Sequence, residues 1–87
     1  MNSQLISPPD FVTSDNIPIL LINADTLTLK LVIATCETVD RAFDIYVCGE
    51  EADPEWFSRV LSHVDKVFKK PTFDEVFQFI KDPDEGQ

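Results

Sequence analysis

The sequence predicts an α+β fold, a three-stranded antiparallel meander followed by an α-helical hairpin packed on one face of the sheet (β-β-β-α-α). Apolar and polar residues alternate through 26–36 and 42–49, as in half-buried strands. Residues 53–81 instead carry apolar residues at helical spacing on both sides of Pro71. We expect residues 1–16 to form an N-terminal arm, 17–82 a single domain and 83–87 a frayed acidic tail.

Composition limits the classes of partner. The chain has 87 residues, of which 44% are hydrophobic, so a single folded domain is expected rather than a disordered chain. Its formal net charge of -9 opposes binding to nucleic acid phosphates or anionic lipid, and favours a basic protein partner. The first residues lack a positively charged region and a long apolar run, so neither a signal peptide nor a membrane anchor is expected. We therefore expect a cytoplasmic protein.

The first strand is expected over residues 17–23, which are apolar on both faces, a pattern typical of burial on both sides. Residues 24–36 are ambiguous. Asp25 or Thr26 can cap a helix, which would give a β-α-β crossover and a parallel sheet. Strict alternation of aliphatic residues from Leu27 to Ile33 favours a strand, and a strand is our prediction.

A third strand over 42–49 follows a polar turn at residues 37–41. Centring this turn near Val39 places Ile33 opposite Ile45, which makes one face of the hairpin continuously aliphatic. In this register Cys36 and Cys48 lie roughly 20 Å apart, whereas a disulfide needs Cα atoms within about 7 Å. We therefore expect both thiols to be free.

The first helix is expected to begin after Asp53 and to continue to Lys70, because apolar residues recur at helical spacing throughout. Asp53 is the expected N-cap, with Pro54 at the first helical position. The alternative, a strand around Val64 to Phe68, would interrupt the helical spacing of the apolar residues. For the second helix, Thr72 and Glu75 form a capping box. Its expected inward face consists of Phe73, Val76, Phe77 and Ile80.

An alternative fold is a small α/β domain with three parallel β-α units. In this alternative, Lys70-Pro71 followed by an amphipathic helix resembles the end of a response-regulator receiver domain, where a Lys-Pro pair closes the last strand. The resemblance covers less than a third of the chain. The acidic pair at the first β-α junction of receivers has no counterpart here, and Asp25 alone does not provide a phosphoacceptor site.

No catalytic, metal or cofactor motif is present in the sequence. His63 is the only histidine, and the two glycines cannot form a phosphate-binding loop. The serine next to His63, Ser62, lies on a different helical face, so it lacks an activating base. The acidic residues 50–55 lack the spacing of a calcium-binding loop. We expect no cofactor, no metal and no enzymatic activity.

The expected function is a non-enzymatic protein-protein interaction module, a regulatory, adaptor or inhibitor protein that acts by stoichiometric binding. Aromatic residues lie at the edges of the apolar helix faces, next to acidic residues. Protein interfaces commonly combine aromatic anchors of this kind with a polar rim. The predicted partner-binding residues are Trp56, His63, Phe79, Glu50, Glu51 and Tyr46. Alternatives are a structural or accessory subunit of a larger assembly, a small enzyme using Glu50, Glu51 and His63, or an inhibitor that mimics nucleic acid.

The first strand is apolar on both faces, and this leads to one further expectation. Two layers cover only one face of a sheet, so Leu20 and Ile22, or Ile19 and Leu21, would be left exposed. We expect the other face to be covered either by Leu5, Ile6 and Phe11 of the N-terminal arm or by a second subunit, giving a homodimer through the open sheet face.

Overall fold

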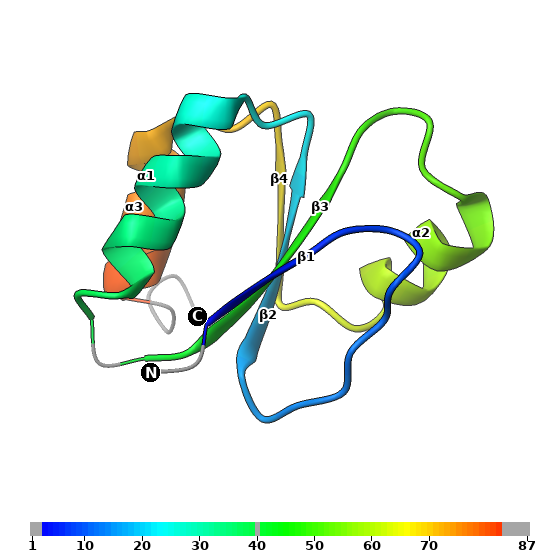
Figure 1. The fold of residues 1–87 in the computed structure, drawn as a ribbon, viewed down its shortest axis with the longest axis horizontal. Helices are drawn as coiled ribbons and strands as arrows, with labels where there is room; N and C mark the ends of the chain where they lie inside the picture. Colours follow the sequence, from blue (N-terminus) through cyan, green and yellow to red (C-terminus); the bar gives the residue numbers. More distant parts are fainter. Residues whose placement is uncertain (1–2, 40, 83–87) are drawn as a thin grey trace.

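The computed structural model describes residues 3–39 and 41–82, and its helices and strands alternate along the chain (Figure 1). The elements are β1 (Gln4–Ile6), β2 (Ile17–Ile22), α1 (Thr26–Cys36), β3 (Phe43–Cys48), α2 (Pro54–Leu61), β4 (Lys66–Lys69) and α3 (Phe73–Lys81). Helices α1 and α3 lie on one face of the sheet and α2 on the other. The expected tail at 83–87 lies outside the described residues.

The four strands form one parallel sheet in the order β1-β3-β2-β4. Leu20 in β2 is opposite Tyr46 of β3 and Val67 of β4. The protein is therefore an α/β domain of the Rossmann/flavodoxin-like type. The predicted α+β meander with a helical hairpin is wrong, and the alternative of parallel β-α units gives the correct class.

The largest difference from prediction is at residues 26–36, which form α1 instead of a strand. Asp25 caps this helix, because its Oδ1 atom accepts a hydrogen bond from the Thr28 backbone N–H at 2.7 Å. The buried stripe consists of Thr28, Val32 and Cys36, spaced one turn apart. The alternation was misleading because almost every position here is aliphatic or β-branched, so the strand and helix periods both fit.

A second correction concerns the long helix predicted for residues 53–70. Helix α2 ends at Leu61, and Lys66–Lys69 form β4 beside β2. The side chains of Val67 and Phe68 pack on opposite faces of the sheet. Pairing with β2, burial of Phe68 and partial burial of Val67 outweigh the helical period of the sequence.

The predicted helix starts are confirmed. Asp53 caps α2 by accepting a hydrogen bond from the Trp56 backbone N–H at 3.1 Å, and Pro54 follows at the first helical position. Thr72 and Glu75 form a capping box at the start of α3. Both features depend only on neighbouring residues, so a change of overall fold leaves them intact. The thiols of Cys36 and Cys48 are free.

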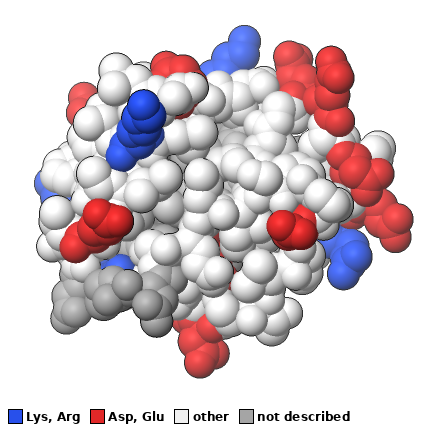
Figure 2. All heavy atoms as spheres, in the orientation of Figure 1, with Lys and Arg blue, Asp and Glu red and all other residues white. Residues whose placement is uncertain are grey.

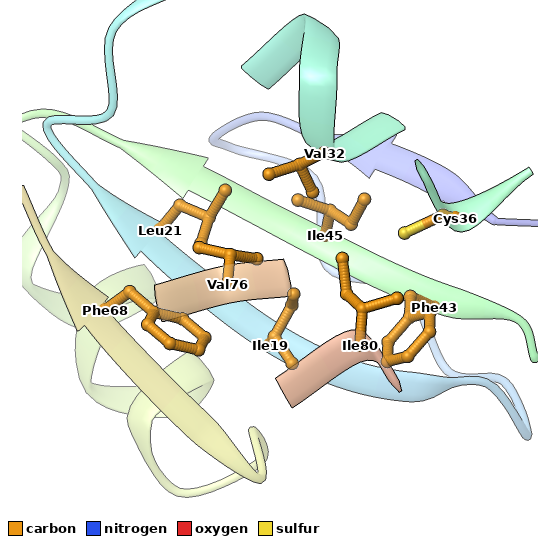
Figure 3. Close-up of a cluster of buried hydrophobic side chains, with 9 residues drawn as sticks. All are labelled: Ile19, Leu21, Val32, Cys36, Phe43, Ile45, Phe68, Val76 and Ile80. Carbon is orange, nitrogen blue, oxygen red and sulfur yellow. The ribbon is translucent and has the colours of Figure 1, made fainter. Parts of the chain in front are cut away.

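The core has two parts, one on each face of the sheet. Ile19 and Leu21 point towards α1 and α3, whereas Leu20 and Ile22 point towards α2. Burying each such side chain contributes about 1.5–3 kcal/mol. Figure 3 shows the first cluster, which contains Ile19, Leu21, Val32, Cys36, Phe43, Ile45, Phe68, Val76 and Ile80.

The N-terminal segment covers part of the α2 face. Ile6 is buried and Phe11 packs against the cluster below α2, as expected, but Leu5 is 48% exposed. Buried Asp44 fixes this segment, because its carboxylate accepts hydrogen bonds from the side chains of Gln4, Ser14 and Asn16. The sheet face through which a homodimer was expected is occupied in this chain by α2 and the N-terminal segment.

Substitutions in α1 distinguish the helix from the predicted strand. Val32 is fully buried and Leu27 is 66% exposed. Val32→Ala should lower the free energy of unfolding by about 2 kcal/mol, and Leu27→Ala by less than about 0.5 kcal/mol. Urea denaturation followed by circular dichroism measures both values. A larger loss for Leu27→Ala would indicate that Leu27 faces the core and would contradict this helix.

Candidate functional site

The candidate site lies at the carboxyl end of the parallel sheet. Strand β2 leads into α1 on one face, whereas its neighbour β3 leads into α2 on the other face (Figure 1). The loops after these two strands therefore diverge. In open α/β sheets such a switch point leaves a crevice outside the strand ends, where ligands bind.

A crevice of about 390 Å³ is present at this switch point. Its volume is within the range of small binding sites in proteins. None of the residues that line it is charged at neutral pH, although the chain as a whole carries a net charge of -9. The lining residues are Ser7, Pro8, Leu21, Asn23, Ala24, Leu29, Val47, Cys48 and Gly49.

Backbone geometry holds the loops of the crevice together. Asn23 has a φ of 59°, in the left-handed region that asparagine tolerates better than most residues. Its backbone N–H donates a hydrogen bond to the Cys48 carbonyl at 2.9 Å. This bond joins the loop after β2 to the end of β3, so the two walls of the crevice are fixed relative to each other.

The residues that line the crevice do not include an activated nucleophile. Burial raises the pKa of the Cys48 thiol, so the protonated form prevails at neutral pH. No acid, base or lysine lines the crevice to activate this thiol. Across residues 3–39 and 41–82, no three histidine, cysteine, aspartate or glutamate residues are placed to hold a metal ion. The lining is instead suited to apolar contacts and to hydrogen bonds with the backbone.

Two exposed leucines of α1, Leu27 and Leu31, form what we call the leucine surface, and a third exposed leucine, Leu5, lies on β1. Leu27 and Leu31 are one helical turn apart, on a different side of α1 from Leu29 and Ile33, which pack against the core. Leu5 is opposite Ile45 in the parallel register and so points to the α1 face of the sheet. Figure 2 shows that carboxylates gather on the side of α2, at the right of the view.

Three of the predicted partner-binding residues come together, but they face inward. Tyr46 is fully buried and its hydroxyl donates to the Val12 carbonyl at 2.8 Å. Trp56 is buried as well, and its indole N–H donates to the Asp10 carbonyl at 2.6 Å. The ring of His63 is 5.8 Å from that of Tyr46. As the chain is folded, these residues hold the N-terminal segment.

The other predicted site residues lie apart from this group. Phe79 packs on the opposite face of the sheet, with its ring centroid 6.0 Å from that of Phe68. Glu50 and Glu51 are exposed in the loop that follows Gly49, at the rim of the crevice. They precede α2, whereas His63 follows it, so the helix separates the carboxylates from the imidazole by roughly 12 Å along its axis.

Sequence reasoning missed both the crevice and the leucine surface. Residues from three separate loops line the crevice, and their proximity depends on the order of the strands. The spacing of Leu27 and Leu31 was an available signal, since residues four apart share one side of a helix. It was not used because this segment was interpreted as a strand.

Alkylation tests whether Cys48 is an ordinary half-buried thiol. Because its pKa is raised, iodoacetamide should modify Cys48 more slowly at pH 8 than it modifies glutathione, and the rate should still be rising above pH 9. Peptide mapping by mass spectrometry separates Cys48 from Cys36, whose pKa burial raises to about 11. Faster modification of Cys48 than of glutathione at pH 7 would indicate an activated nucleophile and contradict a binding role.

Comparison with known proteins adds no functional assignment. No protein-family model matches the chain, and neither a curated protein nor a solved structure matches it. Within the described ranges, no helix has the length and apolar character needed to cross a membrane.

Proposed function

We propose that this protein is a non-enzymatic interaction module, and that it acts by stoichiometric binding of a partner protein at the crevice and the leucine surface. One observation carries the proposal: two exposed leucines lie one turn apart on α1, in a chain that has an uncharged crevice at its strand ends and a net charge of -9. Charged residues are depleted at the centre of protein interfaces, and apolar anchors inserted into pockets contribute most of the binding energy.

The leucine surface gives an apolar partner a thermodynamic reason to bind. Leu27 is 66% exposed and Leu31 is 41% exposed. Full burial of a leucine side chain contributes about 1.5–3 kcal/mol, of which a large part is unrealised at these two positions. A partner that covers both leucines would gain this energy.

Charge at the rim favours basic residues beside the partner's apolar anchor. Glu50 and Glu51 are exposed and follow directly after Gly49, a lining residue of the crevice. Asp53 and Glu55 extend the acidic run into the start of α2. Exposed rim charges mainly accelerate association and select between partners, so binding should weaken as salt is raised. The two free thiols suit a reducing compartment such as the cytoplasm.

The test uses a double substitution, Leu27→Ser with Leu31→Ser, and a matched control, Leu61→Ser. Leu61 is 43% exposed and lies on α2, away from the leucine surface. Each substitution replaces an exposed helical leucine by serine, so the loss of helix propensity per site is similar. Tagged proteins are used to capture partners from a lysate of the source cells, and quantitative mass spectrometry measures recovery.

We expect a partner that wild type and Leu61→Ser recover equally, and that the double variant recovers at least about tenfold less. Circular dichroism must show that all three proteins are folded. Equal recovery of every partner by the double variant would remove the leucine surface from the proposal. Failure of wild type to recover any protein at low salt would contradict the interaction module itself.

A further inference from the structure

We infer that the open edge of β4 is a second binding site, which takes an extended acidic segment of a partner protein as an added strand. Among the described residues, β4 pairs only with β2 and forms one edge of the sheet. An open edge presents unpaired backbone groups, and recognition by strand addition uses them together with pockets for alternate side chains.

The register shows which backbone groups are available. The N–H groups of Ile17 and Asn23 donate to carbonyls of Ala42 and Cys48, so Leu20 and Ile22 are the β2 residues whose backbone groups face β4. The Lys70 N–H accordingly donates to the Ile22 carbonyl at 2.7 Å. In a parallel ladder the N–H and C=O groups of one residue point to the same neighbour, and successive residues alternate between the two sides. The backbone groups of Val67 and Lys69 are therefore directed outward, where an added strand can pair with them.

A groove of about 450 Å³ runs beside this edge, between β4 and α3. The rings of Phe68 and Phe79, 6.0 Å apart, supply its apolar part, and the Lys66 ammonium lies 5.9 Å from the Phe68 ring centroid. Gln78 and Asp82 also line it, together with Glu75, whose carboxylate accepts a hydrogen bond from the Thr72 N–H at 2.9 Å. The capping box thus holds the Glu75 carboxylate at the N-cap residue of α3.

The side chains of β4 define the chemistry of the added strand. Residues 66–69 read Lys-Val-Phe-Lys, so the complementary strand carries acidic residues at two positions with two apolar residues between them. This pattern is the same when read in either direction, so it holds for parallel and antiparallel addition. Three of the seven basic residues, Lys66, Lys69 and Lys70, lie in this short stretch of an otherwise acidic chain.

The same lysines disfavour a second copy of this chain as the occupant. Antiparallel pairing of two β4 edges would place Lys66 opposite Lys69 at both ends of the contact, and like charges directly opposite destabilise a strand pair. Lysine on an edge strand is a common protection against self-association. The edge therefore rejects its own copy and accepts a strand of opposite charge.

Labelled synthetic peptides test this site on the intact chain. The first peptide has Glu-Val-Val-Glu at its centre between threonines, the second has Lys-Val-Val-Lys, and the third is the acidic peptide with alternate backbone amides methylated. Fluorescence anisotropy measures binding to wild type and to two variants. These are Lys66→Glu with Lys69→Glu, and the control Lys30→Glu, at an exposed position of α1 on another part of the surface.

Wild type and Lys30→Glu should bind the acidic peptide at least about tenfold more tightly than the basic one, and the β4 variant should show the reverse preference. Methylation should weaken binding by about tenfold or more, because it removes backbone donors without changing charge. Nitrogen-15 chemical shifts should change at Val67 and Lys69. Absence of binding, or binding that methylation leaves unchanged, would overturn strand addition at this edge.

Discussion

Burial of β2 on both faces determines the architecture of this protein. Ile19, Leu20 and Leu21 are fully buried, and successive side chains enter different halves of the core. A strand of this kind needs neighbours on both edges and cover on both faces, which right-handed β-α-β crossovers provide. Both faces of the sheet are therefore occupied by the chain itself. The strand ends, the sheet edges and the outer sides of the helices are what remains for binding.

The sequence was sufficient to predict features that depend on neighbouring residues, but insufficient to predict the order of elements. The caps at Asp53 and Thr72 were predicted correctly because only residues within one turn take part. The segment Thr26–Cys36 is nearly uniform in hydrophobicity, so its period did not separate helix from strand. For Lys66–Lys69 the deciding contact is the pairing with β2, which is distant in the sequence. The two-faced pattern of β2 did indicate a doubly covered sheet, but local alternation was given more weight.

The candidate site, too, depends on contacts between residues that are distant in the sequence. Trp56 was predicted to bind a partner because of its place at the edge of an apolar helix face, and Tyr46 because of its place on the sheet face away from the predicted helices. Each ring is buried, while its polar atom donates to a carbonyl of the N-terminal segment. The uncharged crevice could not be predicted, because Ser7, Asn23 and Gly49 meet only when three parallel strands end together. Glu50 and Glu51 are at its rim because they follow the end of β3.

Nuclear Overhauser contacts in isotopically labelled protein test the doubly covered parallel sheet most directly. We predict contacts from the backbone of Leu20 to residues adjacent to both Tyr46 and Val67, with sequential amide-amide contacts throughout Thr26–Cys36. The parallel register and α1 together produce this pattern. Cross-strand contacts between Ile33 and Ile45 in an antiparallel hairpin, without the amide-amide contacts of a helix, would contradict it.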